Sequence, residues 1–572
     1  MRATIGSKPG ATYRLNLAGV ADFAVGSHKR AAALLIAIAL LAFLPGFFNI
    51  PPVDRDEARF AQATKQMVES GDYVDIRFQE ESRYKKPVGI YWLQSAVVNA
   101  ANALGVRRAT TAIAAYRIPS LLGAIAAVLL TYWAALGFVS RRAAFLAGVM
   151  MASCILLGVE ARLAKTDAVL LEACIAAMGA LGRVYLADRG IGRTDGSPWT
   201  LPAIFWTALA GGTLIKGPLI FMFVGLTVVT LAIADRAMPR WFWRLKPLPG
   251  ILWLIVLVAP WFIAIVARSG MNFFSESIGD DMLAKVGTGQ ESHGQPPGFY
   301  LLLFWVTFFP GAILAGLAAP SIWKVRREPG AKFLLAWIVP AWIVFEIVAT
   351  KLPHYVLPLY PAIAILIAGV VDHHGISSRP WLIRGTVWWL LIAAIFAALI
   401  VATHIMVGQQ MGLIAWPFMA GAVIFALRAW WLYDEDGAEH SLLRGAAATI
   451  FLSIAAFGAT VPLLPGLFPA AQIARSLRGA GCVPSVVTAG YHEPSLVFLV
   501  GTGTRSSDGV GAADFLLAGG CRFAIVERAQ ERAFVARAEA VGLRYSSGGR
   551  VDGYNIGTGS RVSLAIYRAD RG

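Results

Sequence analysis

The chain has 572 residues, of which 57% are hydrophobic and only 15% are charged. Soluble domains carry about 25% charged residues, so this composition excludes an ordinary soluble protein. The formal net charge of +16 does not indicate a nucleic-acid partner, because cytoplasmic loops of membrane proteins collect Lys and Arg and the sequence has no nucleic-acid motif. We therefore expect a polytopic α-helical membrane protein.

Long apolar runs recur along most of the chain. Since a bilayer-spanning helix needs about 20 apolar residues, the sequence predicts about thirteen spans. They are expected at 31–49, 113–138, 142–159, 168–187, 200–215, 217–235, 248–267, 299–319, 331–350, 356–372, 383–404, 411–431 and 442–464. The basic N-terminus has no clear cleavage site after the first run, so we interpret residues 1–30 as a cytoplasmic tail and residues 31–465 as the transmembrane domain.

The loops between these spans alternate in charge. Lys and Arg gather in every second loop, for example at Arg141 and Arg142 and again at Arg236 and Arg240. The positive-inside rule makes that side cytoplasmic. An odd number of spans then puts the N-terminus inside and the C-terminus outside. The outer face receives residues 50–110, 160–167, 268–298, 351–355 and the tail after 465.

The first outer loop, 50–110, holds an unusual density of charge. Two helices are expected along the membrane surface, at 56–70 and 87–104, because both segments are amphipathic or too short to span comfortably. Carboxylates favour helix N-termini, and this capping role is the favoured interpretation for Asp54. The other chemistry-bearing residues of the loop are Asp56, Glu57, Arg59, Tyr84, Lys85 and Lys86.

Residues 466–572 differ in character from the rest of the chain. Short β-rich runs at 485–490, 522–527 and 562–567 and a helical run at 534–542 predict a small α/β domain outside the cytoplasm. Cys482 and Cys521 lie in this domain, where an oxidising compartment permits a disulfide, but the sequence leaves open whether their Cα atoms are close enough.

Polar side chains also occur at the short outer turns between spans. Charges at membrane depth are costly and usually mark function. We expect these turns to meet near Asp56, where cations would neutralise phosphate oxygens and a carboxylate would orient or deprotonate an acceptor. The turns carry Glu160, Arg162, Lys165 and Asp167, then Lys216, and then Lys351, His354 and Tyr355.

Structural alternatives exist for several of these residues. Glu160 and Arg162 are equally well explained as an ion pair. For Lys216, a snorkelling lysine is the less favoured alternative, whereas for His354 a hydrogen-bonded histidine is the commoner role. No convincing metal-ligand cluster is visible, because the pair Glu291 and His293 is too small a set. We therefore predict no certain cofactor, and a divalent metal is left open without a ligand cluster to support it.

Several stretches together resemble the family C (GT-C) membrane glycosyltransferases. The chain is most similar to the bacterial aminoarabinose–lipid A transferases and their lipid-linked-sugar relatives, which are related to the protein O-mannosyltransferases. The resemblance rests on DRDEARFAQATKQMVESGDYVDIRF, RYKKPVGIYW, EARLAKTDAVLLEA, IKGP, KLPHYVLPLYPAIAIL and YHEPSLVFLVG.

The resemblance implies roles for particular residues. Asp56, with Glu57 beside it, falls on the essential acidic position, and Asp167 falls on a second acidic motif. Donor phosphate binding is implied for Lys86 and Lys216, with Arg59, Lys285 and Tyr355 as companions. Tyr84, Lys85, Arg162, Lys351 and His354 are expected to line the substrate site.

The resemblance also implies an activity. The expected enzyme transfers a sugar from undecaprenyl phosphate to lipid A, lipopolysaccharide core or another envelope acceptor, with inversion, in the bacterial inner membrane. Lys85 stands where aminoarabinose transferases tend to have an acidic residue, which would suit an acidic sugar or an extra phosphate. Rival hypotheses are a flippase or transporter for a lipid-linked sugar, a protein O-glycosyltransferase and a non-enzymatic envelope scaffold.

Overall fold

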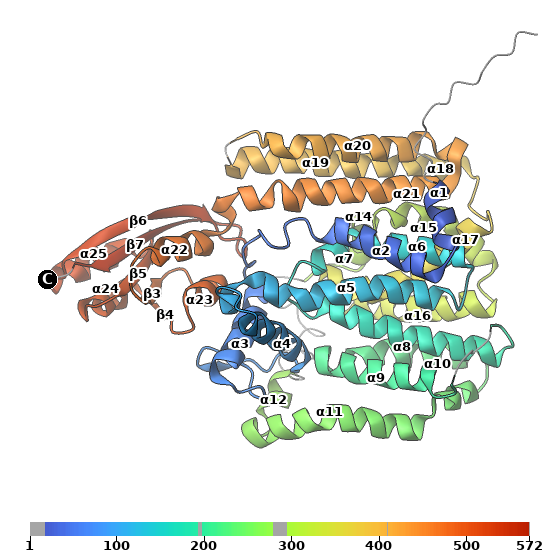
Figure 1. The fold of residues 1–572 in the computed structure, drawn as a ribbon, viewed down its shortest axis with the longest axis horizontal. Helices are drawn as coiled ribbons and strands as arrows, with labels where there is room; N and C mark the ends of the chain where they lie inside the picture. Colours follow the sequence, from blue (N-terminus) through green and yellow to red (C-terminus); the bar gives the residue numbers. More distant parts are fainter. Residues whose placement is uncertain (1–17, 193–196, 278, 280–293, 409, 571–572) are drawn as a thin grey trace, which may run out of the picture.

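Most of the chain forms helices that run side by side, and a small sheet domain extends from one end of this bundle (Figure 1). The computed structural model describes residues 18–192, 197–277, 279, 294–408 and 410–570. Helices α3 and α4 lie at the same end of the bundle as the sheet domain, across the path of the long helices. This end of the molecule gathers the segments that the sequence assigns to the outer face.

The helices of the bundle and its first long loop follow the predicted apolar runs closely. They are α1 Ala18–Val25, α2 His28–Phe43, α3 Asp56–Ser70, α4 Gly89–Ala103, α5 Ile113–Ala135, α6 Arg141–Ala152, α7 Ile155–Glu160, α8 Asp167–Asp188, α9 Thr200–Lys216, α10 Leu219–Asp235, α11 Pro247–Ser269, α12 Asn272–Phe274, α14 Phe299–Thr307, α15 Gly311–Lys324, α16 Pro329–Ile347, α17 Tyr360–Asp372, α18 Pro380–Ile383, α19 Trp388–Gly408, α20 Trp416–Trp431 and α21 Tyr433–Ser453.

The number of membrane spans differs from the predicted thirteen. Among the described residues, eight helical segments are long and apolar enough to cross a membrane, and a ninth is added if α14 and α15 count as one span. Two expected spans are broken. The run 299–319 divides into α14 and α15, which are bent by 118°, and the run 142–159 divides into α6 and α7. The count of thirteen therefore remains a prediction.

Small residues allow the central helices to pack closely. α5 packs along α8 and α6, and α8 packs along α9. At Gly123 of α5 an added Cβ would lie only 3.0 Å from the Cα of Val169 in α8, so a larger residue would separate the two helices. This tight core fixes the ends of α5, α8 and α9, where the polar residues singled out by the sequence lie.

The helix α3 is not a simple surface helix. It coincides with the predicted segment 56–70, and it ends at Gly71, whose φ of 71° suits glycine. α3 packs against α4 and against α23 (Pro494–Val500) of the C-terminal domain. Its side chains are therefore mostly buried, including those of Gln62, Thr64 and Lys65.

The C-terminal domain is an α/β unit, as the sequence predicts. Its strands are β3 Ser485–Ala489, β4 Arg505–Ser507, β5 Arg522–Glu527, β6 Tyr545–Tyr554 and β7 Arg561–Ala569, in the order β4-β3-β5-β7-β6. β3 pairs in parallel with β4 and β5, and β7 pairs antiparallel with β5 and β6. The helices are α22 Pro469–Arg478, α23, α24 Gly509–Leu517 and α25 Glu531–Ala540. The three predicted strands and the predicted helix correspond to β3, β5, β7 and α25.

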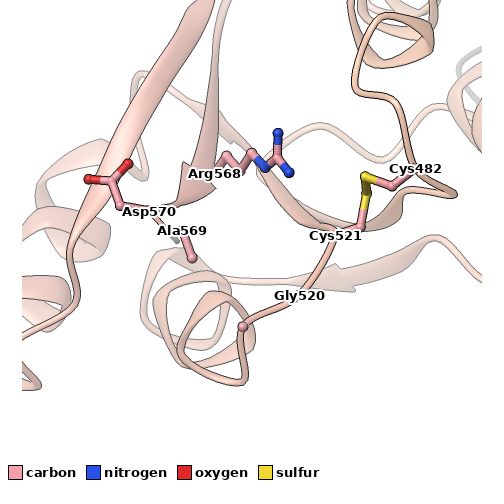
Figure 2. A pocket seen from close by; sticks show the side chains of 7 residues that line it. Cys482, Gly520, Cys521, Arg568, Ala569 and Asp570 are labelled. Atoms are coloured by element: carbon pink, nitrogen blue, oxygen red, sulfur yellow. A yellow bond between two sulfur atoms is a disulfide. The ribbon is translucent and has the colours of Figure 1, made fainter. Parts of the chain in front are cut away.

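Cys482 and Cys521 form a disulfide in this domain. Their Cα atoms are 6.2 Å apart and the bridge closes a loop with a sequence separation of 39 residues. Figure 2 shows the bridge beside a pocket lined also by Gly520, Arg568 and Asp570. The pocket contains none of the residues that the sequence proposes for the site.

Replacing both bridged cysteines with serine should destabilise the C-terminal domain by about 3–4 kcal/mol, because the unfolded chain loses the constraint of a closed loop. Thermal unfolding of the purified protein, followed by limited proteolysis, measures the change. A reductant should lower the unfolding temperature of the wild type only. Equal sensitivity of the serine variant to reductant would contradict the assignment, because its remaining cysteines, Cys154 and Cys174, are free and buried.

Candidate active site

The turn before α3 places Asp56 in an open position. Asp56 is the first residue of α3 and is exposed, whereas the next residue, Glu57, is buried. The preceding residue, Arg55, has φ 68° and ψ −109°, a backbone conformation that side-chain-bearing residues rarely adopt. Such conformations persist where the surroundings enforce them and are common at functional sites.

Asp54 does not cap α3, contrary to the expectation from sequence. α3 has no side-chain cap, and Asp54 Oδ1 instead accepts a hydrogen bond of 2.9 Å from the backbone N–H of Ser495, at the start of α23. Burial raises the pKa of Asp54 to about 6, although the bonds from Ser495 act in the opposite direction. The residue therefore joins the first loop to the C-terminal domain.

Glu57 has a supporting role rather than the catalytic one that the sequence suggested. Its two carboxylate oxygens accept bonds from Arg117 Nε and Nη2 at 2.8 and 2.9 Å, and from the backbone N–H groups of Val53 and Ala164. Only 1% of each side chain of the pair is exposed. Each carboxylate oxygen accepts two hydrogen bonds in the protein interior, so Glu57 is not available to a substrate.

Arg117 is the main residue that the sequence analysis missed. Besides Glu57, its guanidinium donates to the backbone oxygens of Phe47, Ile50 and Pro51, so that all five of its N–H groups are used. It is the one charge within the apolar stretch of α5, and a charge inside a span was a signal that could have identified it.

All three polar turns meet in a group that we call the carboxylate–cation cluster, which consists of Glu160, Lys165, Asp167, Lys216 and His354. Lys216 Nζ lies 2.5 Å from Asp167 Oδ1. Lys165 Nζ lies 3.2 Å from Glu160 Oε2 and 3.7 Å from Asp167 Oδ2. His354 Nδ1 and Nε2 lie 3.5 Å from Glu160 and 3.6 Å from Asp167, respectively.

The two carboxylates of the cluster are matched by two ammonium groups, and His354 lies against both carboxylates. The four carboxylate and ammonium side chains are largely buried, with exposed fractions of 4–11%. Burial disfavours the charged form of Lys165, but Glu160, Asp167 and Asp56 together outweigh burial and raise the pKa of Lys165 above its ordinary value. Asp56 therefore lies within electrostatic reach of the cluster.

Two of the cations expected to bind phosphate, Lys86 and Lys216, are carried by segments that meet at the end of α9. Lys216 Nζ lies 5.6 Å from the centre of the Tyr355 ring, in a cation–π contact. Lys86 precedes α4, whose Gly89 lies so close to Leu214 of α9 that an added Cβ would be 2.7 Å from the Leu214 carbonyl oxygen. The segment carrying Lys86 is thus held against the last turn of α9, which ends in Lys216. Arg59 lies one turn after Asp56 in α3.

Three residues predicted to line the substrate site have structural roles instead. Tyr84 is buried and donates to Asp75 at 2.8 Å, which together with burial raises the pKa of Tyr84 to about 12. Arg162 donates to the carbonyl oxygens of Ala42, Pro45 and Gly158 and to Ser453, and so ties α7 to α2 and α21. It does not pair with Glu160, which pairs with Lys165.

Lys351 is also buried and donates to the carbonyl oxygen of Val348 at 2.7 Å. Lys85 is exposed, as a residue at a site entrance would be. Lys285, Glu291 and His293 lie outside the described residues.

A group of potential metal ligands is present, although the sequence analysis found none. Atoms of Glu160, Asp167 and His354 lie within 4.8 Å of one another. The same carboxylates are, however, neutralised by Lys165 and Lys216. A divalent cation would bring uncompensated positive charge to this buried position, so the donor set fits a metal poorly.

Arg117→Met should destabilise the protein by about 3–5 kcal/mol, because Glu57 is left buried without its partner. The double variant Arg117→Met, Glu57→Gln should lose less free energy of unfolding than the two single variants lose together, because each single variant already removes the same interaction. Thermal unfolding of the four proteins in detergent measures this coupling. Additive losses would show that the pair does not hold the loop.

The cluster should not bind Mg²⁺, Mn²⁺ or Zn²⁺ at micromolar concentration in the wild type. In the Lys165→Met, Lys216→Met double variant the carboxylates lose their partners, so metal binding should appear. Isothermal titration of chelator-treated protein tests both. Binding by the wild type that is abolished by Asp167→Asn would contradict the charge argument.

The chain is similar to known proteins both in sequence and in fold. No family model matches the chain. An undecaprenyl phosphate-alpha-4-amino-4-deoxy-L-arabinose arabinosyl transferase of Erwinia tasmaniensis is 28% identical over 383 residues, which are 64% of this chain and 64% of that protein. The chain therefore matches slightly less than two thirds of the length of that relative. A transferase of the same name from Enterobacter is 24% identical over 398 residues, which are 66% of this chain and 67% of that protein.

Solved structures extend the similarity to nearly the whole chain. ArnT from Cupriavidus metallidurans in the apo state has a TM-score of 0.70 at 19% identity, over 93% of this chain and 97% of that protein. The same protein bound to undecaprenyl phosphate has a TM-score of 0.67 at 18% identity, with the same coverage. The chain is thus a multi-pass membrane protein with the fold of the family C membrane glycosyltransferases, and its resemblance to the aminoarabinose transferases is confirmed.

Proposed function

We propose that this protein transfers a sugar from an undecaprenyl phosphate-linked donor to an envelope acceptor such as lipid A. The observation that carries the proposal is that Asp56 is exposed at the start of α3, next to Glu57, whose carboxylate accepts the N–H of Ala164 in the turn that also carries Lys165 of the cluster. The relatives are named as arabinosyl transferases of an undecaprenyl phosphate-linked sugar, which supports sugar transfer from this class of donor.

The donor phosphate would be held by Lys216 and Lys86, with Arg59 and Tyr355 as companions. An ammonium group has three N–H donors, and the bond from Lys216 to Asp167 uses one of them. The contact with Asp167 orients Lys216 in a largely buried position. Cations fixed in this way stabilise the negative charge that develops on a departing phosphate.

Asp56 would act on the acceptor. Its exposed position at the start of α3 leaves the carboxylate open to an acceptor. If the acceptor is a lipid A phosphate, Asp56 orients an oxygen that is already anionic. If the acceptor is a hydroxyl group, Asp56 removes its proton. In both cases the oxygen attacks the anomeric carbon as the phosphate leaves from the opposite side, so the configuration inverts.

We place the reaction at the periplasmic face of the bacterial inner membrane. The Lys- and Arg-rich loops mark the cytoplasmic side by the positive-inside rule. α3, α4 and the C-terminal domain share the opposite end of the bundle from most of these loops, with the N-terminus inside and the C-terminus outside in this assignment (Figure 1).

Asp56→Asn should reduce sugar transfer about 100-fold or more, because the carboxylate that orients the acceptor is lost. Binding of undecaprenyl phosphate should stay within about threefold of wild type, since its proposed ligands are elsewhere. Mass spectrometry of lipid A and core from a deletion strain complemented with each variant measures transfer and identifies the sugar from its mass.

Glu80→Gln, which changes an exposed carboxylate in the same loop, is the matched control and should transfer normally. A flippase or a scaffold should not depend on Asp56. Normal envelope glycans with Asp56→Asn at wild-type protein levels would therefore reject the transferase proposal.

A further inference from the structure

The C-terminal domain contacts the residues on the N-terminal side of Asp56. Asp54 accepts the backbone N–H of Ser495 at the start of α23, a contact between residues 441 positions apart. The carboxylate thus occupies the place of a helix-capping group for a helix of another domain. Asp54 is two residues before Asp56, so this bond fixes the backbone that leads into the catalytic turn.

Arg55 makes a second contact with the same domain. Gly557, in the connection between β6 and β7, faces the Arg55 side chain so closely that an added Cβ would lie 2.4 Å from Arg55 Nε. A side chain at position 557 would have to displace the Arg55 guanidinium from this place. Arg55 is also the residue with φ 68°, a conformation that needs external support in a residue with a Cβ.

The body of α3 is held by the same domain. Lys65 Nζ donates to the carbonyl oxygen of Phe498 at 2.9 Å, and Gln62 Nε2 donates to Thr502 Oγ1 at 2.9 Å. The Phe498 ring meets the Tyr116 ring of α5 edge to face, with centroids 5.2 Å apart. α3 cannot shift along α23 without breaking these buried contacts.

We propose that the C-terminal domain positions Asp56 for transfer, through Asp54 and through the close approach of Gly557 to Arg55. The proposal rests on the proposed function of Asp56. Asp54, Arg55 and Gly557 are positioning residues, because they act on the turn and not on the substrate. Glu57 and Arg117 hold the following residue from the membrane domain, so Asp56 is an exposed side chain on a backbone anchored from both sides.

This arrangement predicts a separation of kcat from KM. Lys86, just before α4, and Lys216, at the end of α9, would hold the donor phosphate, and the contacts at Gly89 and Lys216 join them to other helices of the membrane domain. Loosening the turn should misplace Asp56 while the donor still binds. A displacement of about 1 Å at a reacting group can lower a rate about 100-fold.

Three variants test the proposal in the full-length protein, with undecaprenyl phosphate-linked sugar as donor and lipid A as acceptor. Asp54→Ala removes the acceptor for Ser495, and Asp54→Asn keeps an oxygen in its place. Gly557→Ala displaces Arg55 without straining its own backbone, because Gly557 does not have a positive φ. Gly503→Ala is the matched control, since an added Cβ there meets no atom within 4 Å.

We expect Asp54→Ala and Gly557→Ala to lower kcat at least about tenfold, with donor KM within about threefold of wild type. Asp54→Asn should retain at least about half of the wild-type kcat, and Gly503→Ala should be unchanged. Full kcat in both Asp54→Ala and Gly557→Ala would overturn the positioning role. So would a rise in KM without a fall in kcat.

The variants distinguish a failure of the positioning role from a failure of the proposed function. If Asp56→Asn is inactive while Asp54→Ala and Gly557→Ala are fully active, transfer by Asp56 stands and positioning by the C-terminal domain fails. If Asp56→Asn is active, the function itself fails. Should Asp54→Ala not fold, Gly557→Ala carries the test alone, because the three atoms nearest to its added Cβ all belong to the flexible side chain of Arg55.

Discussion

The buried pair of Glu57 and Arg117 is the interaction on which the candidate site depends. Two ions removed from water are stable only when nearly every hydrogen-bonding position is filled, and here all five guanidinium N–H groups and both carboxylate oxygens are used. The guanidinium also binds three backbone oxygens between residues 47 and 51. An irregular loop thereby becomes a rigid support for the residue next to Glu57.

A second constraint is charge balance within the carboxylate–cation cluster. Its four charged side chains come from α7, α8, α9 and the turn between α7 and α8. Because each carboxylate has an ammonium partner, the cluster can remain largely buried in the helix bundle. Lys165 faces oxygens of both carboxylates, whereas Lys216 contacts Asp167 and the Tyr355 ring.

The C-terminal domain belongs to this site more closely than its separate fold suggests. It has its own sheet and its own core, yet α23 packs on α3 and closes the turn that carries Asp56. The disulfide lies elsewhere in the domain, at a pocket that contains none of the site residues (Figure 2). The domain thus combines an independent stabilising bridge with an interface that is specific to the membrane part.

The sequence by itself determined the class of fold, most helix positions, the bounds of α3 and the strands β3, β5 and β7. These follow from local periodicity and apolar content, which the chain expresses within a few turns. Tertiary structure decided which polar groups meet. Asp56 and Glu57 are neighbours in sequence, but adjacent helical residues point about 100° apart, so one is exposed and the other faces Arg117. Asp54 bonds to Ser495, which lies 441 positions later in the chain. Such a hydrogen bond depends on the distance between two folded segments, and no local sequence pattern encodes that distance.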